Sequence, residues 1–298
     1  MLEDRYKILG KLNQGSFGKI HKGIDTETGR FVAIKVETGK LKGLLKQEVQ
    51  IYRKFSECMI SPILKWPAVH AFAVLPTGAN LMIMDLLGPD LDCVLKKSPQ
   101  RRLPSYKVGY LAYKMIHVLR IFHQRGFVHR DIKPQNFVLE YYEGKCPKFP
   151  EVFLVDYGLA KRYLNADKTH ARFALKCGLG GTVRYVSANT HLGLEPSRRD
   201  DLQSLAYVLI YLALGQLPWQ HRKEHRGRDK DDVNREVMVL KMRTTTENLC
   251  ERLIEPLRTA TMQFLFYVES LMYHEEPDYA YCQELFAVLH NNFLGFNS

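Results

Sequence analysis

The sequence predicts an α+β fold in which a small, strand-rich first part is followed by a larger, mainly helical part. Up to residue 88, short runs of alternating or clustered apolar residues are separated by turn residues. After Gly88-Pro89, apolar residues recur mostly at helical spacing. The 298 residues are 46% hydrophobic and 25% charged, a composition typical of a globular chain with a substantial core.

The first part is predicted to be a sheet with one helix. Residues 44–55 have a helical period, which places Leu44, Glu48, Ile51 and Phe55 on one face. Turn-forming residues at 25–30 and 77–80 connect neighbouring strands. The predicted strands span 5–12, 19–24, 31–36, 71–76 and 81–86.

The second part is predicted to contain two long helices. Ser105, after Pro104, is the expected N-cap of a helix that runs through Phe122 and ends near Gly126. A helix over 200–215 is apolar on nearly every side, so we expect it to be central and buried. We predict one domain over residues 1–298, with an N-terminal part at 1–84, a connecting segment at 85–88 and a second part at 89–298.

Composition also limits the class of protein. The six cysteines include no C-x-x-C pair and no nearby histidine in ligand register, which argues against a zinc site and a secreted disulfide framework. The longest apolar run, 205–214, is far shorter than the ~18 residues of a membrane span. We therefore expect a soluble monomer without a membrane partner, in the cytoplasm or alternatively also in the nucleus.

A glycine-containing segment, Asn13–Gly18, lies between the first two predicted strands. Its glycines would let a tight hairpin bring backbone N–H groups against phosphate oxygens. Asn13 stands where a G-x-G-x-x-G loop has glycine, and asparagine is the residue next most tolerant of positive φ. By itself this segment is equally compatible with a plain structural hairpin.

Two charged residues occupy apolar positions. Lys35 lies within an apolar strand, and Glu48 lies on the apolar face of the predicted helix. Because burying an unpaired ammonium group is costly, we expect the two side chains to pair. The alternative is a lysine whose stem is buried while its ammonium reaches water, together with a glutamate at a frayed helix face.

The segment His129–Asn136 fits the pattern H-R-D-x-x-x-x-N, and it is followed by Val155-Asp156-Tyr157-Gly158. With these motifs the chain resembles a eukaryotic protein kinase. Ser187-Ala188-Asn189, where most kinases have A-P-E, is similar to the casein kinase 1 group. Further stretches that resemble this group are 86–91, 181–185, 189–193, 197–202 and 217–219.

The resemblance covers residues 5–293 and is that of a divergent member of the casein kinase 1 group. The vaccinia-related and tau-tubulin kinases are the nearest relatives that it suggests, and V-D-Y-G is similar to the magnesium loop of the vaccinia-related kinases. It implies a bilobal kinase fold with a small β-rich N-lobe, one helix in that lobe, and a larger, mainly helical C-lobe.

The resemblance implies a serine/threonine protein kinase that uses ATP and Mg²⁺. Asp131 would orient the substrate hydroxyl, Lys133 would neutralise the γ-phosphate, and Glu48 would hold Lys35 at the α and β phosphates. The catalytic residues implied are Lys35, Glu48, Asp131, Lys133 and Asn136, and the metal ligands are Asn136 and Asp156. The implied ATP site comprises Leu12, Asn13, Gln14, Gly15, Ser16, Phe17, Gly18, Lys19, Ile20, Ala33, Lys35, Met84, Asp85, Leu87 and Leu139.

The substrates implied are proteins with acidic or already phosphorylated segments. Arg184 matches the anion-binding arginine of the casein kinase 1 group, and Lys230 or Arg228 would complete the anion site. Residues 221–230 contain five basic and two acidic residues, part of a formal charge of +11. No aromatic residues interrupt this stretch, which argues against a nucleic-acid site.

Two other hypotheses stay open at this point. One is a nucleotide-binding pseudokinase scaffold, because Asn13 replaces a loop glycine and Tyr157 replaces the usual phenylalanine after the metal-binding aspartate. The other is a basic protein whose main ligand is a polyanion.

Overall fold

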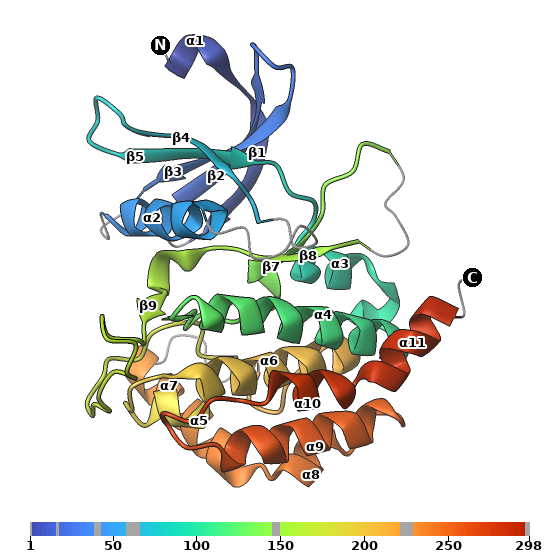
Figure 1. Cartoon of the computed structure of the whole chain (residues 1–298). Helices are drawn as coiled ribbons and strands as arrows, with labels where there is room; N and C mark the ends of the chain where they lie inside the picture. Colours follow the sequence, from blue (N-terminus) through green and yellow to red (C-terminus); the bar gives the residue numbers. More distant parts are fainter. Residues whose placement is uncertain are drawn as a thin grey trace. The chain divides into compact units, whose positions relative to one another are not determined.

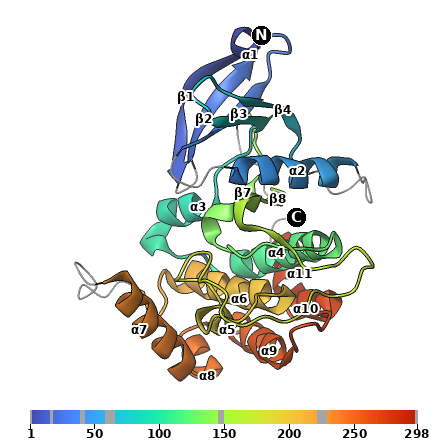
Figure 2. The same cartoon turned by 90° about the vertical axis from the view of Figure 1, so that its left-hand side faces the viewer.

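The computed structural model describes residues 2–15, 18–38, 43–57, 66–144, 150–220 and 229–295 (Figures 1 and 2). The chain divides into two compact units. The first comprises Met1–Pro89 and Val138–Gly158, and the second comprises Asp90–Phe137 and Leu159–Ser298. The predicted division at 84, 85–88 and 89 stays a prediction.

The first unit is built on an antiparallel sheet with the strand order β1-β2-β3-β5-β4 (Figure 1). Short helix α1 (Leu2–Arg5) precedes the sheet, and α2 (Leu44–Glu57) packs against β4 and β5. Alternating apolar residues form a core that includes Tyr6, Val32, Ile34 and Ile83. The strands are β1 (Tyr6–Gly15), β2 (Gly18–Asp25), β3 (Phe31–Glu37), β4 (Val69–Val74) and β5 (Asn80–Asp85).

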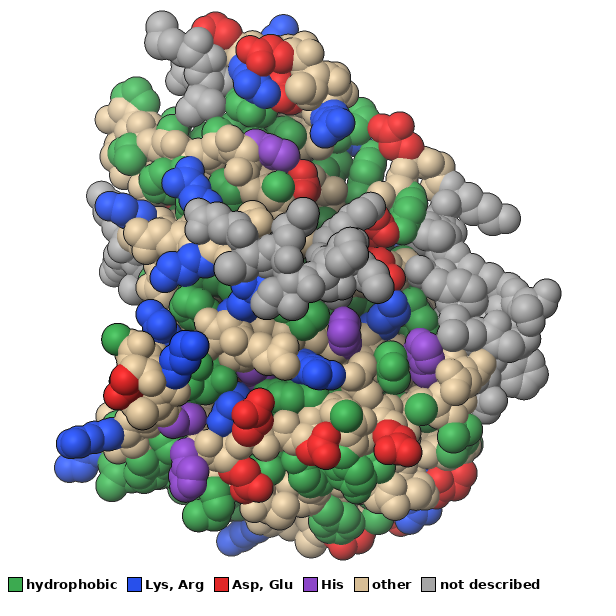
Figure 3. Space-filling view, in the orientation of Figure 1, with side chains coloured by type: hydrophobic (Ala, Val, Ile, Leu, Met, Phe, Trp, Pro, Cys, Tyr) green, Lys and Arg blue, Asp and Glu red, His purple; other side chains and the backbone are tan. Residues whose placement is uncertain are grey.

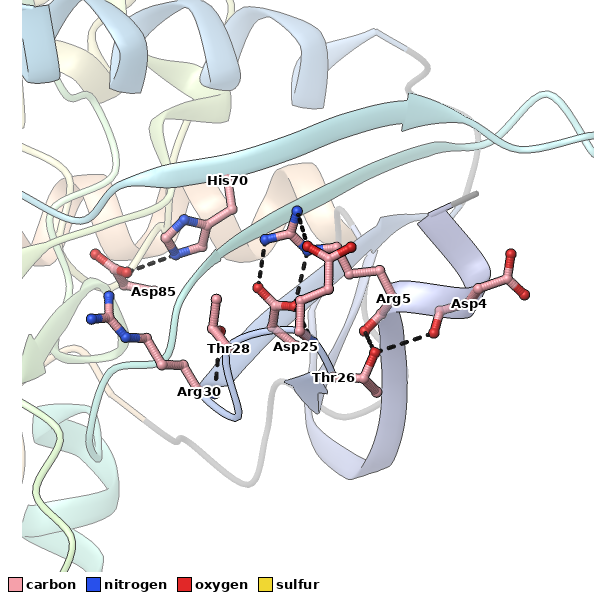
Figure 4. Close-up of polar contacts among 9 residues, drawn as sticks. Asp4, Arg5, Asp25, Thr26, Thr28, Arg30, His70 and Asp85 are labelled. Atoms are coloured by element: carbon pink, nitrogen blue, oxygen red, sulfur yellow. Dashed lines mark hydrogen bonds and ion pairs between the residues drawn. The ribbon is translucent and has the colours of Figure 1, made fainter.

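A salt bridge fixes where β1 begins relative to the end of β2 (Figure 4). Arg5 donates two hydrogen bonds to the Asp25 carboxylate, from Nε at 2.9 Å and Nη2 at 2.7 Å. The backbone N–H of Thr26 donates to the carbonyl of Arg5 at 2.8 Å. With Tyr6 opposite Asp25 at one end of the ladder, Gly15 lies opposite Gly18 at the other. The salt bridge therefore lies at the end of the ladder opposite to Gly15 and Gly18.

The second unit is mainly helical and is organised around α6 (Arg198–Leu214), as its apolar sequence predicts. Nearly all of α6 is buried, and both α4 and α9 pack against it (Figure 2). α10 and α11 pack against α4. The other helices are α3 (Leu91–Lys97), α4 (Ser105–Gln124), α5 (Ala188–His191), α7 (Lys230–Arg243), α8 (Thr246–Cys250), α9 (Leu257–Ser270), α10 (Tyr279–Glu284) and α11 (Ala287–Gly295).

Short elements connect the functional segments. Strand β6 (Phe127–Val128) pairs with β9 (Lys161–Arg162), and β7 (Phe137–Leu139) pairs with β8 (Val152–Leu154). The 3₁₀ turns are η1 (Pro99–Arg101), η2 (Pro134–Asn136) and η3 (Tyr157–Leu159).

The predicted N-cap of α4 is wrong by one residue. Ser105 is the first helical residue, and Pro104 is the N-cap. The Pro104 carbonyl accepts hydrogen bonds from the N–H groups of Lys107 and Val108, so the helix starts from the proline without a capping side chain. At the other end the prediction is confirmed, because Gly126 follows the helix with a φ of +83°. The α+β fold class is also confirmed.

Candidate active site

The β1–β2 hairpin carries the predicted phosphate-binding residues. Ser16 and Phe17 lie outside the described residues. Gly18 is required by close packing, since a Cβ there would lie 2.2 Å from the Val36 carbonyl oxygen. Asn13 has no positive φ, so its tolerance of that conformation is not used. Instead its side-chain oxygen accepts a hydrogen bond from the Gln14 N–H at 2.7 Å.

Strand register brings together part of the predicted nucleotide site. Asn13 lies opposite Ile20, and Ile20 lies opposite Lys35, so these three residues form one row across β1, β2 and β3. Buried Ala33 and Met84 are partners in the β3–β5 ladder. Leu139 is buried on β7, Leu87 is half-buried after β5, and Leu12, Gln14 and Lys19 are exposed on the hairpin.

Asp85 ends β5 in a well-defined polar setting (Figure 4). Its carboxylate accepts hydrogen bonds from the Ala68 N–H and from His70 Nε2, both at 2.8 Å. Burial raises the pKa of this carboxyl, but the hydrogen bonds from His70 and Ala68 and the nearby positive charge together outweigh burial, so the net pKa is lower than usual. The following segment is tied to β7, because Gly88 N donates to the Leu139 carbonyl at 2.8 Å.

Three charged side chains meet in the first unit. Lys35 Nζ donates to Glu48 Oε2 at 2.7 Å and to Asp156 Oδ1 at 2.8 Å. The predicted pairing of Lys35 with Glu48 is therefore present, and α2 supplies the buried glutamate. Burial lowers the pKa of Lys35, but the two carboxylates more than compensate and hold it above its ordinary value. Burial also raises the pKa of Glu48, and Lys35 offsets this only in part.

Asp156 is held by a turn that uses the tyrosine after it. Asp156 has a φ of +68°, an uncommon conformation for a residue other than glycine. The Tyr157 hydroxyl donates to the Leu154 carbonyl at 2.6 Å and closes the turn. The Tyr157 ring stacks against Tyr52 and Phe55 of α2. Tyrosine at this position thus makes a hydrogen bond that phenylalanine lacks.

The H-R-D segment in the second unit gathers the predicted catalytic residues. Asp131 is buried, and its Oδ2 accepts a hydrogen bond from Lys133 Nζ at 2.5 Å. Asn136 Nδ2 donates to the Asp131 backbone carbonyl at 2.8 Å. Asn136 can reach Asp131, five positions earlier, because the 3₁₀ turn η2 brings Asn136 back toward the start of the loop. Together these contacts fix the orientation of the Asp131 carboxylate.

Asp201, near the start of α6, anchors this loop. Its carboxylate accepts from the backbone N–H groups of His129, at 2.6 Å, and Arg130, at 2.9 Å. Arg130 has a φ of +70°, so these bonds stabilise an otherwise unfavourable conformation. Burial lowers the pKa of His123, whose Nε2 lies 2.9 Å from Asp201. A neutral His123 that donates from Nε2 accounts for this contact.

Residues 6–268 match the family described as protein kinase domain. The chain belongs to this family. Membership of this family accounts for the sheet-containing N-lobe and the helical C-lobe, and a protein kinase domain is a phosphotransferase domain whose usual cofactors are ATP and Mg²⁺.

Sequence reasoning missed one residue of the kinase site. Thr182 Oγ1 donates to Asp131 Oδ1 at 2.8 Å, although the two residues are 51 positions apart in the sequence. The motif Gly181-Thr182-Val183-Arg184-Tyr185 flags the segment, but only the fold shows which hydroxyl reaches the carboxylate. Asp131 is thus held from both sides, by Lys133 and by Thr182.

The two predicted substrate-anion residues have different surroundings. Arg184 is half-buried, and its guanidinium lies 5.6 Å from the Tyr185 ring centroid and 5.5 Å from that of Tyr211. Lys230 is exposed at the first position of α7. Residues 221–228, including Arg228, lie outside the described residues.

The predicted metal ligands suit magnesium by their chemistry. Asn136 uses its amide nitrogen to bind the Asp131 carbonyl, so the amide oxygen is the atom suited to a metal. Asp156 supplies a carboxylate. Within the described ranges there is no group of three or more His, Cys, Asp and Glu residues able to hold a metal by themselves. Likewise, none of the described helices is long and apolar enough to cross a membrane.

Proposed function

We propose that this chain is an active serine/threonine kinase of the casein kinase 1 type, which transfers the γ-phosphate of ATP to protein substrates. The observation that carries the proposal is the setting of Asp131. A carboxylate that is oriented by one cation and one hydroxyl is suited to positioning a nucleophile.

The chain retains each charge that phosphoryl transfer needs. Asp131 orients the substrate hydroxyl and accepts its proton, which leaves late in a loose transition state. Lys133 places positive charge beside Asp131, and Lys35 is pre-positioned for phosphates by Glu48. Asn136 and Asp156 each carry an oxygen suited to Mg²⁺, which would supply further positive charge for the transferred group. These retained charges favour an enzyme over a scaffold.

Contacts among the motif residues support the assignment to the casein kinase 1 group. Ser187 Oγ donates to Asp200 Oδ1 at 2.7 Å, and Asn189 Nδ2 donates to the same oxygen at 3.2 Å. The S-A-N residues and the R-R-D-D-L stretch therefore form one hydrogen-bonded unit. A divergent member of the group, with vaccinia-related and tau-tubulin kinases as nearest relatives, fits this pattern.

The proposed substrates are proteins with acidic or phosphorylated segments, for which Arg184 is the recognition residue. On the face seen in Figure 3, Lys and Arg side chains lie in separate groups among neutral and acidic ones. On this face, the distribution favours local anion recognition over a continuous nucleic-acid surface. The predicted monomeric state and cytoplasmic or nuclear location stay predictions.

A nucleotide-binding pseudokinase is the second candidate, and one contact favours it. The Asn13 side-chain oxygen accepts a hydrogen bond from the Gln14 N–H. This N–H belongs to the hairpin whose N–H groups are expected to approach phosphates. The retained Asp131 and Asp156 weigh against this alternative.

Phosphate transfer from radiolabelled ATP to casein, in the presence of Mg²⁺, tests the proposal. Wild type should label casein, while Asp156→Asn should not, because it removes a metal-binding charge at nearly constant volume. Circular dichroism of both proteins controls for folding. Equal labelling by the two proteins, or none by wild type, would refute the proposed activity.

Arg184→Ala tests the proposed substrate class. KM for a peptide with a phosphoserine upstream of the target should rise ~10-fold or more, as expected for a lost charge-assisted hydrogen bond of ~1.5 to 3 kcal/mol. KM for the unphosphorylated peptide should change much less. Equal losses on both peptides would assign Arg184 a structural role instead.

A further inference from the structure

Residues 182–186 form a turn whose backbone carbonyls are held by side chains. The N–H groups of Tyr185 and Val186 both donate to the Thr182 carbonyl, at 2.8 and 3.1 Å. The next carbonyls along the turn have side-chain donors instead. Trp219 Nε1 donates to the Arg184 carbonyl at 2.8 Å.

Lys241 on α7 contacts this turn twice. Its Nζ donates to the Val183 carbonyl at 2.8 Å and to the Val186 carbonyl at 2.6 Å. The ammonium also lies 5.3 Å from the Tyr207 ring centroid and 5.2 Å from that of Trp219. Lys241 therefore hydrogen-bonds to the backbone on both sides of Arg184, and its ammonium group lies beside two aromatic rings.

A surface role cannot account for Lys241, because the residue is 5% exposed. Burial lowers its pKa well below the usual value, and no carboxylate in the described part of the chain forms an ion pair with it. Burying an amine without an acidic partner costs free energy, and the two hydrogen bonds from Lys241 to backbone carbonyls offset this cost. Even a neutral amine has two N–H groups, enough for both bonds.

We propose that Lys241 is a positioning residue for substrate selection, which fixes the 182–186 turn so that Arg184 presents its guanidinium to the acidic or phosphorylated part of a substrate. The inference rests on the proposed function for the identity of the substrate. Its structural half, the anchoring of the turn, is independent of that function.

Substitutions of Lys241 can separate the role of its N–H groups from the role of its side-chain length. A cavity of about 450 Å³ is bordered by Lys241, Trp219 and Tyr207 together with residues of α8 and α9. Lys241→Arg, whose side chain would border the same space, keeps N–H donors. Lys241→Met removes the donors at similar length. Arg243→Met, which removes an exposed cation from the same helix, is the matched control.

A double-mutant cycle with Arg184→Ala tests whether Lys241 acts through Arg184. In otherwise wild-type protein, Lys241→Met should raise KM for the phosphorylated peptide roughly 10-fold, since misplacing a recognition group is costly. In Arg184→Ala protein it should change that KM less than about 2-fold, because the recognising group is already gone. Lys241→Arg should recover most of the selectivity, and Arg243→Met should retain all of it. Additive effects of Lys241→Met and Arg184→Ala would overturn the proposal.

Hydrogen exchange separates this inference from the proposed function. The Tyr185 and Val186 amides should exchange faster in Lys241→Met than in wild type, whereas α6 amides should not change. Trp219→Phe, which removes the indole donor to the Arg184 carbonyl and keeps an aromatic ring of smaller size, gives a second route if Lys241→Met fails to fold. If wild type transfers no phosphate, the function is refuted, and faster exchange would still support the anchoring. Unchanged exchange in both variants would refute the anchoring itself.

Discussion

The two charged clusters of the kinase site are held together differently. In the first unit, Lys35, Glu48 and Asp156 are joined by ionic hydrogen bonds, and the two carboxylates would repel each other without the lysine. In the second unit, Asp131 belongs to a loop that backbone bonds to Asp201 and an amide bond from Asn136 already fix. Ion pairs between side chains hold the first cluster, whereas hydrogen bonds from backbone N–H groups and from an amide fix the loop of the second.

This difference predicts which substitutions affect chemistry alone. A change that neutralises Asp131 should leave the loop in place, because its supports do not depend on that charge. A change that removes Lys35 should alter both catalysis and stability, because the same charge supports both.

The largest effect is expected for Asp131→Asn. Loss of the proton-accepting carboxylate should lower kcat about 1000-fold, within the range of general-base contributions. The thermal midpoint should shift by no more than about 2 °C, since the Asp201 contacts remain. Calorimetry beside phosphate-transfer assays checks both values. A large fall in thermal midpoint would contradict the claim that the bonds to Asp201 and the amide bond of Asn136 hold this loop.

Lys35→Met should reduce activity about 100-fold and also make stability depend on pH. Burial raises the pKa of Glu48 to about 7 even with Lys35 present, and removing the lysine raises it further. The folded variant therefore binds a proton that the unfolded chain loses above its ordinary pKa of 4.5. Consequently its stability should rise as pH falls from 8 toward 5.

Thermal melts of Lys35→Met and wild type across that pH range measure how the difference in their stability depends on pH. At pH 8 the variant should be destabilised by about 3 kcal/mol, the usual cost of breaking a buried ion pair. The melts in the presence and absence of Mg-ATP should also show a smaller ligand-induced shift than in wild type. A deficit independent of pH would mean that charge does not hold this cluster.

Thr182→Ala should have a moderate effect on the second cluster. The lost hydrogen bond to the Asp131 carboxylate is expected to lower kcat roughly 10-fold. Thr182→Ser keeps the hydroxyl and should stay within about 3-fold of wild type. Steady-state kinetics on an unphosphorylated peptide measures both variants. Equal losses in alanine and serine variants would point to the methyl group, and so to packing.

The smallest effect is expected at the exposed β1–β2 hairpin, which belongs to neither charged cluster. Asn13→Gly frees the Gln14 N–H from the asparagine side chain and should lower KM for ATP by no more than about 3-fold. Lys7→Ala, another exposed change on β1, serves as the control. A rise in KM would show that the Asn13 contact assists the nucleotide, which would weaken the case for a pseudokinase.

Local patterns determined much of the fold. The period of two in β1 to β5 and the helical period of α2 depend on neighbours in the sequence, so burial of one face follows from the pattern. The Lys35–Glu48 pair was also foreseeable, because two opposite charges on apolar faces need each other. The start of α4 was predicted one residue late because the N-cap residue is Pro104, which has no side-chain hydrogen-bond acceptor. Its carbonyl accepts the first hydrogen bonds of the helix.

Sequence alone indicated the class of the predicted strands and helices, because this class depends on local period. It also indicated the motif residues Lys35, Glu48, Asp131, Asn136 and Asp156, through opposite charges on apolar faces and through motifs that resemble those of protein kinases. Tertiary structure decided which distant groups complete them. Thr182 reaches Asp131 from 51 positions away, and Lys241 reaches Val183 from 58 positions away. Hydrogen bonds act only at contact distance, and the chain path that creates such contacts is set by packing around α6, not by any local pattern.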